Sequence, residues 1–220
     1  MIQKSTIAFL KKIKTNNNRD WFEKNKHLYL LAKEDVEKSL EEIITKIKTF
    51  DKRISPEINA KKCMFRIYRD VRFSKDKRPY KNNLGASVNP KGKKDISPGY
   101  YIHIEPNNSF VAGGMWMPSA PELAKIRQEI DYNLNEFTKI TNDKNFKKVV
   151  GTLNQNDKLV NIPKGFPKDH KGIEFLKLKS FIAVGSIKEK DVQSKDFIKS
   201  VILICKTLQP LNNFLQRAID

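Results

Sequence analysis

The spacing of hydrophobic residues changes twice along this 220-residue chain, which restricts the folds that the chain can adopt. Up to about residue 49, apolar residues such as Val36, Leu40 and Ile44 recur every three or four positions, which is the period of an amphipathic helix. Between residues 63 and 116 they alternate with polar residues, as in a strand. The helical period returns after residue 120. This order predicts an α+β fold, with a central, mainly antiparallel sheet packed by N-terminal and C-terminal helices.

Five segments have the character of strands, namely residues 65–73, 84–88, 99–106, 109–116 and 181–187. In the first of them the alternation predicts that Phe65 and Phe73 face the core. The turn signal Pro106-Asn107-Asn108 separates the third from the fourth. Gly113 and Gly114 belong to neither a GxxxxGK[ST] nor a GxGxxG motif. We therefore interpret these two glycines as a bulge or a close approach of backbone.

The sequence contains no internal repeat, low-complexity tract or flexible linker, so we expect a single domain over residues 1–220. No apolar run approaches the roughly 20 residues that span a bilayer. The N-terminal segment is typical of an amphipathic helix rather than an export signal. We therefore expect a cytoplasmic protein without membrane contact, and the sequence leaves the oligomeric state open.

The cysteine and histidine spacing indicates neither a metal site nor a disulfide. Cys63 and Cys205 are the only cysteines, and neither has a partner at metal-ligand spacing, so we expect two reduced thiols in or near the core. A nucleotide-binding fingerprint, a nucleophile elbow and a hydrolase triad are all missing from the sequence. The sequence therefore predicts no cofactor.

Four of the eight arginines lie within the segment RIYRDVRFSKDKRPYK (66–81), where seven basic residues against two acidic ones leave a net charge of +5. The guanidinium group binds phosphate or carboxylate through paired hydrogen bonds. The charge of the whole chain, +18, is weaker evidence, because most of it comes from dispersed lysines. The segment predicts an anion site on a strand and the loop after it, formed by Arg66, Tyr68, Arg69, Arg72, Lys77, Tyr80 and Lys81.

The ligand of such a site would be a phosphorylated metabolite or nucleic acid. A second hypothesis is an enzyme for an anionic substrate, with His103 or Asp70 as the acid or base. It requires that Tyr101, His103 and Glu105, which alternate on one strand, share a cleft with the arginines. A third hypothesis is an interaction module for an acidic protein. The structural alternative to all three is a lattice in which Asp70 and Asp76 pair with neighbouring arginines.

Five segments of the chain, in this order, resemble the bacterial and fungal family known as domain of unknown function 2461. They are NNNRDWFEKNKHLY, FRIYRDVRFSKDKRPYKNN, GYYIHIEP, GGMWMP and PKGFPKDH. The resemblance covers roughly residues 5–215, and the RIYRDxRFSKDKxPYK element is long and specific. It implies one domain, and it brings no established activity, substrate or catalytic residue with it.

Overall fold

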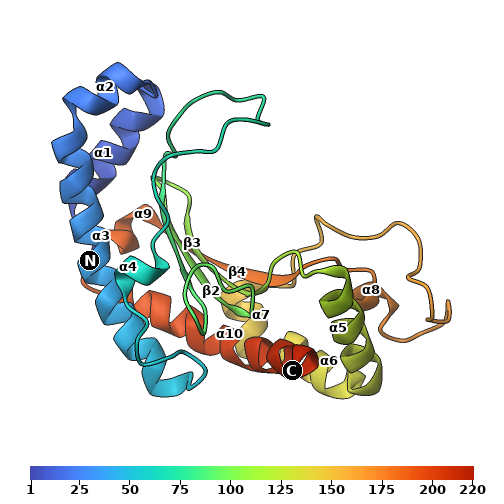
Figure 1. The fold of residues 1–220 in the computed structure, drawn as a ribbon. Coiled ribbons are helices and arrows are strands. Elements are labelled where there is room, and N and C mark those ends of the chain that lie inside the picture. Colours follow the sequence, from blue (N-terminus) through green and yellow to red (C-terminus); the bar gives the residue numbers. More distant parts are fainter.

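The computed structural model describes all 220 residues and confirms the α+β fold (Figure 1). Its strands are β1 (Leu84–Val88), β2 (Gly99–Ile104), β3 (Ser109–Met115) and β4 (Phe181–Ile187). Its helices are α1 (Lys4–Thr15), α2 (Arg19–Lys24), α3 (Lys26–Phe50), α4 (Ala60–Cys63), α5 (Ala120–Tyr132), α6 (Leu134–Asn142), α7 (Lys144–Val150), α8 (Ile173–Leu176), α9 (Glu189–Val192) and α10 (Phe197–Ile219). None of these helices combines the length and the apolar character that crossing a membrane requires.

The sheet is antiparallel throughout, with the strands in the order β1-β2-β3-β4. Its register places Tyr101 of β2 between Ser87 of β1 and Ala112 of β3, and Ala112 in turn lies opposite Val184 of β4. Directly opposite residues project from the same face of a sheet. These four side chains therefore form one row across the face that the helices leave open.

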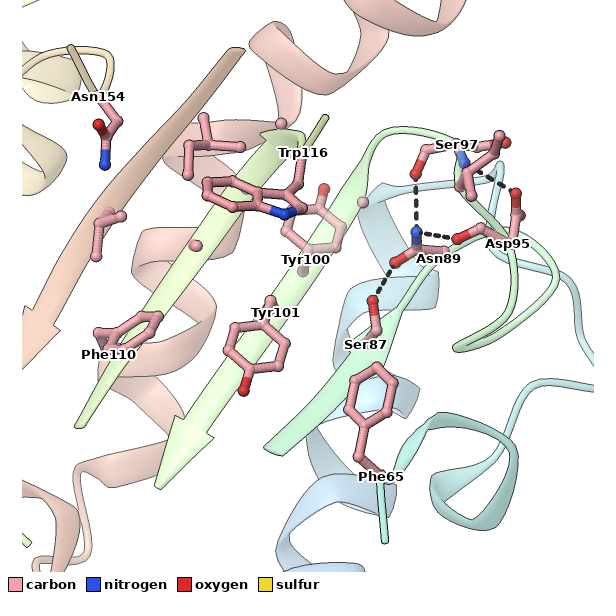
Figure 2. A pocket seen from close by; sticks show the side chains of 17 residues that line it. Phe65, Ser87, Asn89, Asp95, Ser97, Tyr100, Tyr101, Phe110, Trp116 and Asn154 are labelled. Atoms are coloured by element: carbon pink, nitrogen blue, oxygen red, sulfur yellow. Dashed lines mark hydrogen bonds between the residues drawn. The ribbon is translucent and has the colours of Figure 1, made fainter. Parts of the chain in front are cut away.

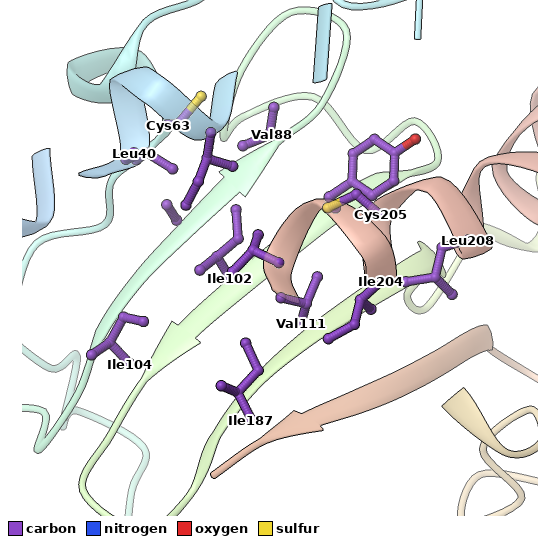
Figure 3. Packing of buried hydrophobic residues seen from close by; sticks show 14 of the residues in the cluster. Leu40, Cys63, Val88, Ile102, Ile104, Val111, Ile187, Ile204, Cys205 and Leu208 are labelled. Atoms are coloured by element: carbon purple, nitrogen blue, oxygen red, sulfur yellow. The ribbon is translucent and has the colours of Figure 1, made fainter. Parts of the chain in front are cut away.

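The other face of the sheet carries the hydrophobic core, and α10 lies across it (Figures 1 and 3). Ile102 and Val111 of the sheet face Ile204 and Leu208 of α10 (Figure 3). Gly113 permits this close packing, because a Cβ atom at that position would lie 2.9 Å from Leu208. The interpretation of Gly113 as a point of close approach is confirmed.

A buried charge joins three elements beside this core. Asp51, at the end of α3, is 1% exposed and accepts hydrogen bonds from the Arg53 guanidinium and from the Tyr100 hydroxyl (2.8 Å). Arg53 also donates to the carbonyl oxygens of Pro98 and Asn212. The pair therefore connects α3 with the start of β2 and with α10.

The prediction of a strand over residues 65–73 is wrong. Only isolated bridges form there, between Met64 and Ala86 and between Tyr68 and Tyr80. The Asp70 carboxylate accepts the backbone N–H of Arg72, and such local side-chain bonds replace a strand ladder. Phe73, expected in the core, is 95% exposed. The segment is a loop that extends away from the sheet (Figure 1, green-blue).

Candidate ligand-binding site

The open face of the sheet is hollowed into a pocket of about 620 Å³ (Figure 2). Its floor includes the row of Ser87, Tyr101, Ala112 and Val184, so all four strands contribute. Small-molecule sites in proteins commonly enclose about 300–1,000 Å³. The pocket therefore has the size of a site for a small molecule.

Aromatic rings form much of the pocket surface. The rings of Phe110, Tyr101 and Phe65 lie in a row across the sheet, with centroids 5.9 Å apart for the first pair and 6.2 Å for the second (Figure 2). Trp116 lies to one side of this row, above Tyr101 in Figure 2, and is 62% exposed. Such rings offer flat apolar surfaces on which another planar ring can stack.

Polar groups occupy one corner of the pocket. Asn89 donates hydrogen bonds to the carbonyl oxygens of Asp95 and Ser97, and its own side-chain oxygen accepts one from Ser87 (Figure 2). These bonds satisfy the Asn89 amide and hold residues 90–98 in place. Asn154 contributes a second amide from the segment after α7, on the opposite side of the pocket (Figure 2).

A chain of hydrogen bonds runs along β2 from the pocket. The Tyr101 hydroxyl lies 3.0 Å from His103 Nδ1, and His103 Nε2 lies 3.0 Å from a carboxylate oxygen of Glu105. The His103 ring stacks on Phe110, with centroids 4.5 Å apart. Gly85 leaves room for the tyrosine, since a Cβ atom there would lie 2.5 Å from its hydroxyl. The alternation along β2 and just past its end places Tyr101, His103 and Glu105 on one face. The cleft shared with the arginines that the enzyme hypothesis required does not form, because neither His103 nor Arg72 lines the pocket.

Two cations of the predicted anion site, Lys81 and Arg66, form no ion pair; neither lines the pocket, but Lys81 lies against Phe65, which does. Lys81 is half-buried, its Nζ lies 5.3 Å from the Phe65 ring centroid, and it forms no ion pair. Arg66 is exposed and also forms no ion pair. Burial, and then the charge of Arg66, lower the pKa of the Lys81 ammonium. A bound anion would counteract both effects, because a nearby negative charge favours the charged ammonium.

The other arginines of the segment have partners within it. Arg72 binds Asp70, and Arg69 and Arg78 both bind Asp76, each with a contact of 2.7 Å. These arginines therefore follow the predicted lattice of arginine and aspartate. Hydrogen bonds from Arg72 lower the pKa of Asp70 to about 2, so this carboxylate is ionised and already engaged near neutral pH.

The remaining predicted residues stabilise the loop. Tyr80 is 3% exposed and stacks on Phe22 of α2, with ring centroids 4.0 Å apart. Tyr68 packs on the same two rings from the outer side. The Lys77 ammonium donates to the carbonyl oxygens of Val71 and Arg72. Their placement fixes the base and the tip of the loop.

The comparison with protein families agrees with the resemblance found in the sequence. A family model described as conserved hypothetical protein, DUF2461, matches residues 5–214. The chain belongs to this family. No curated protein matches it, and no solved structure does. Any function of this DUF2461 protein must therefore be argued from the site itself.

The pattern of the sequence did not reveal the pocket of this DUF2461 protein. Phe65 was expected to face the core, yet it lies at the pocket beside Tyr101. Phe110, Ala112, Ile182 and Val184 line the pocket as well. The available signal was that β3 and β4 carry apolar residues at successive positions, which indicates strands with an apolar surface on both faces.

Proposed function

We propose that this protein binds a small molecule that carries a flat ring and an anionic group, either phosphate or carboxylate. The ring would lie in the pocket against Phe65, Tyr101 and Phe110, and the anion would meet Lys81 and Arg66. One observation carries the proposal, namely that the half-buried, unpaired Lys81 ammonium lies 5.3 Å from the ring centroid of Phe65, and that Phe65 lines the pocket.

The position of Lys81 is fixed before any ligand arrives. Its backbone N–H donates to the Ile67 carbonyl oxygen at 2.8 Å, and the preceding Tyr80 exchanges two hydrogen bonds with the Asn17 side chain. A cation whose backbone is anchored loses less freedom when it binds an anion than one on a mobile segment. This preorganisation supports a dedicated site rather than a dispersed basic surface.

A small phosphorylated or carboxylated molecule fits these observations better than nucleic acid does. The apolar space is a pocket on the sheet, whereas three of the four arginines in the basic segment are already paired with aspartates. For a nucleic-acid ligand, the logarithm of the affinity should fall linearly with the logarithm of the salt concentration. The slope should be about 0.7–0.9 for each phosphate neutralised. Measuring binding between low and physiological salt separates the two ligand classes.

Replacing Lys81 with glutamine should weaken the binding of an aromatic anion by roughly 10- to 100-fold, because it removes a charged hydrogen bond. Isothermal titration of phenyl phosphate and of adenosine 5′-monophosphate measures this effect. The neutral compounds benzyl alcohol and adenosine should bind wild type and Lys81→Gln equally. Lys77→Gln is the matched control, because Lys77 belongs to the same segment and its ammonium binds loop carbonyls. Equal losses in both variants would contradict the assignment of Lys81.

A further inference from the structure

We infer that Tyr101 is a catalytic residue that takes a proton from the bound ligand while it gives its own phenolic proton to His103, and that Glu105 stabilises the imidazolium that forms. This inference rests on the proposed function, because the ligand supplies the proton. It assigns the pocket to a class of reaction, the proton shift within a small anionic compound.

The hydrogen bonds permit transfer from Tyr101 to His103. When the Tyr101 hydroxyl donates to His103 Nδ1, the neutral imidazole must carry its hydrogen on Nε2 and donate it to Glu105. A weak nucleophile or acid is activated in the same way wherever it donates to a base that a third group orients. Of the three residues, Tyr101 is the one that lines the pocket, and the other two lie behind it along β2.

The surroundings hold this chain in one geometry. Glu105 accepts a hydrogen bond from Asn82 at 2.6 Å on one oxygen and from Asn108 at 3.2 Å on the other. The side chains of His103 and Glu105 are only 11% and 13% exposed, so little solvent competes for these bonds. Stacking on Phe110 fixes the plane of the imidazole. A relay needs this kind of orientation, because proton transfer depends on short, aligned contacts.

The proposed step moves one proton and changes no oxidation state. A ligand X–H bond breaks and its proton goes to the Tyr101 oxygen, while the phenolic proton goes to His103 Nδ1. The ligand keeps the electron pair of the broken bond, and the imidazolium that forms lies beside the Glu105 carboxylate. Lys81 and Arg66 attract the negative charge on the ligand. Return of the proton to another ligand atom completes an isomerisation without a co-reactant.

The phenol does not ionise by itself at neutral pH. Burial, and then the charge of Glu105, raise the pKa of Tyr101. Its proton therefore leaves only when His103 accepts it, and the reactivity of Tyr101 must depend on His103. This dependence can be measured without knowing the natural ligand.

The test uses 3-(fluorosulfonyl)benzoate, which combines a ring, a carboxylate and a group that reacts with activated phenols. The Tyr101 oxygen forms a bond to sulfur, fluoride leaves, and the phenolic proton goes to His103. Mass spectrometry of the intact protein and of its peptides gives the labelling rate at each tyrosine. Tyr132, which is 72% exposed and lies outside the pocket, is the internal reference. We expect Tyr101 to react about 100-fold faster than Tyr132.

Variants of the relay should separate labelling from binding. His103→Asn should lower the Tyr101 labelling rate by about 100-fold, and Glu105→Gln by about tenfold. Both should still bind the unreactive analogue 3-sulfobenzoate like wild type, as measured by isothermal titration. Added imidazole should restore labelling in His103→Ala, a rescue that a purely structural role would not give. If His103→Asn does not fold, Glu105→Gln carries the test.

Failure of the relay and failure of the proposed function give different results. If 3-sulfobenzoate binds but Tyr101 labels no faster than Tyr132, the relay is overturned and the binding site stands. If 3-sulfobenzoate does not bind but the neutral phenylmethylsulfonyl fluoride labels Tyr101 in a His103-dependent manner, the relay stands and the anion site fails. Labelling of Tyr101 that is unchanged in His103→Asn and Glu105→Gln also overturns the relay.

Discussion

Replacing Ala112 with phenylalanine is expected to weaken the binding of aromatic anions by about 100-fold while leaving the protein folded. Ala112 lies in the floor of the pocket, in register with Tyr101 on one side and Val184 on the other. A new ring at this position would fill the space that the ligand ring needs. Burying a ring contributes about 1.5–3 kcal/mol, so affinity should fall by about 100-fold.

Two comparisons make this prediction specific to the pocket. Ala112→Ser changes little volume and should keep most of the affinity for phenyl phosphate in isothermal titration. Ala183 precedes Val184, the partner of Ala112, in β4, but it faces the core and is 0% exposed. Ala183→Phe should therefore destabilise the fold by overpacking. Thermal melting of all three variants distinguishes a filled pocket from an unfolded protein. Wild-type affinity in Ala112→Phe would show that the ligand binds elsewhere.

Replacing Asp51 with asparagine should lower the free energy of unfolding by about 3–5 kcal/mol, because it leaves the largely buried Arg53 guanidinium, 18% exposed, without its counter-charge. The same change weakens the hydrogen bond from Tyr100. Urea denaturation at neutral pH measures the loss. Glu57→Gln is the control, because Glu57 is 83% exposed in its ion pair with Lys62. This substitution should change the free energy of unfolding by no more than about 0.5 kcal/mol. A loss below 1 kcal/mol in Asp51→Asn would contradict the role of this pair.

The acid dependence of stability should change in the same variant. Burial raises the pKa of Asp51, but hydrogen bonds and charge from Arg53 outweigh it, so the net pKa is below the usual 3.8. A lowered pKa in the folded state adds stability that is complete above the unfolded value. This stability is lost as the pH falls through the folded value, below 3.8. Asp51→Asn should lack this component of acid unfolding.

The α+β fold could be predicted because hydrophobic period is a local property. The expected strands 84–88 and 181–187 have the observed bounds, and the two between them end within two residues of the expected positions. The loop over residues 65–73 was mistaken for a strand because its residues do alternate. Hydrogen bonds from nearby backbone N–H groups to the Asp70 and Asp76 carboxylates stabilise a loop instead. The alternation of apolar and polar residues carries no information about such bonds.

The candidate site was predicted in part. The shared face of Tyr101, His103 and Glu105 follows from spacing on one strand. The pocket depends on β3 and β4, whose pairing joins residues about 70 positions apart in the chain. The net charge of residues 66–81 does not show which cations are free. Lys81 and Arg66 form no ion pair, whereas the other three arginines pair with Asp70 or Asp76.

The most direct test of the proposed site is the fluorescence of Trp116 during titration with phenyl phosphate. Trp116 lines the pocket and Trp21 lies in α2, so the variant Trp21→Phe leaves one tryptophan as the reporter. We predict a saturable change in Trp116 fluorescence with phenyl phosphate, a much weaker change with benzyl alcohol, and no change when Ala112→Phe is added. No response of Trp116 to phenyl phosphate, or the same response in the filled pocket, would contradict the assignment of this pocket as the ligand site.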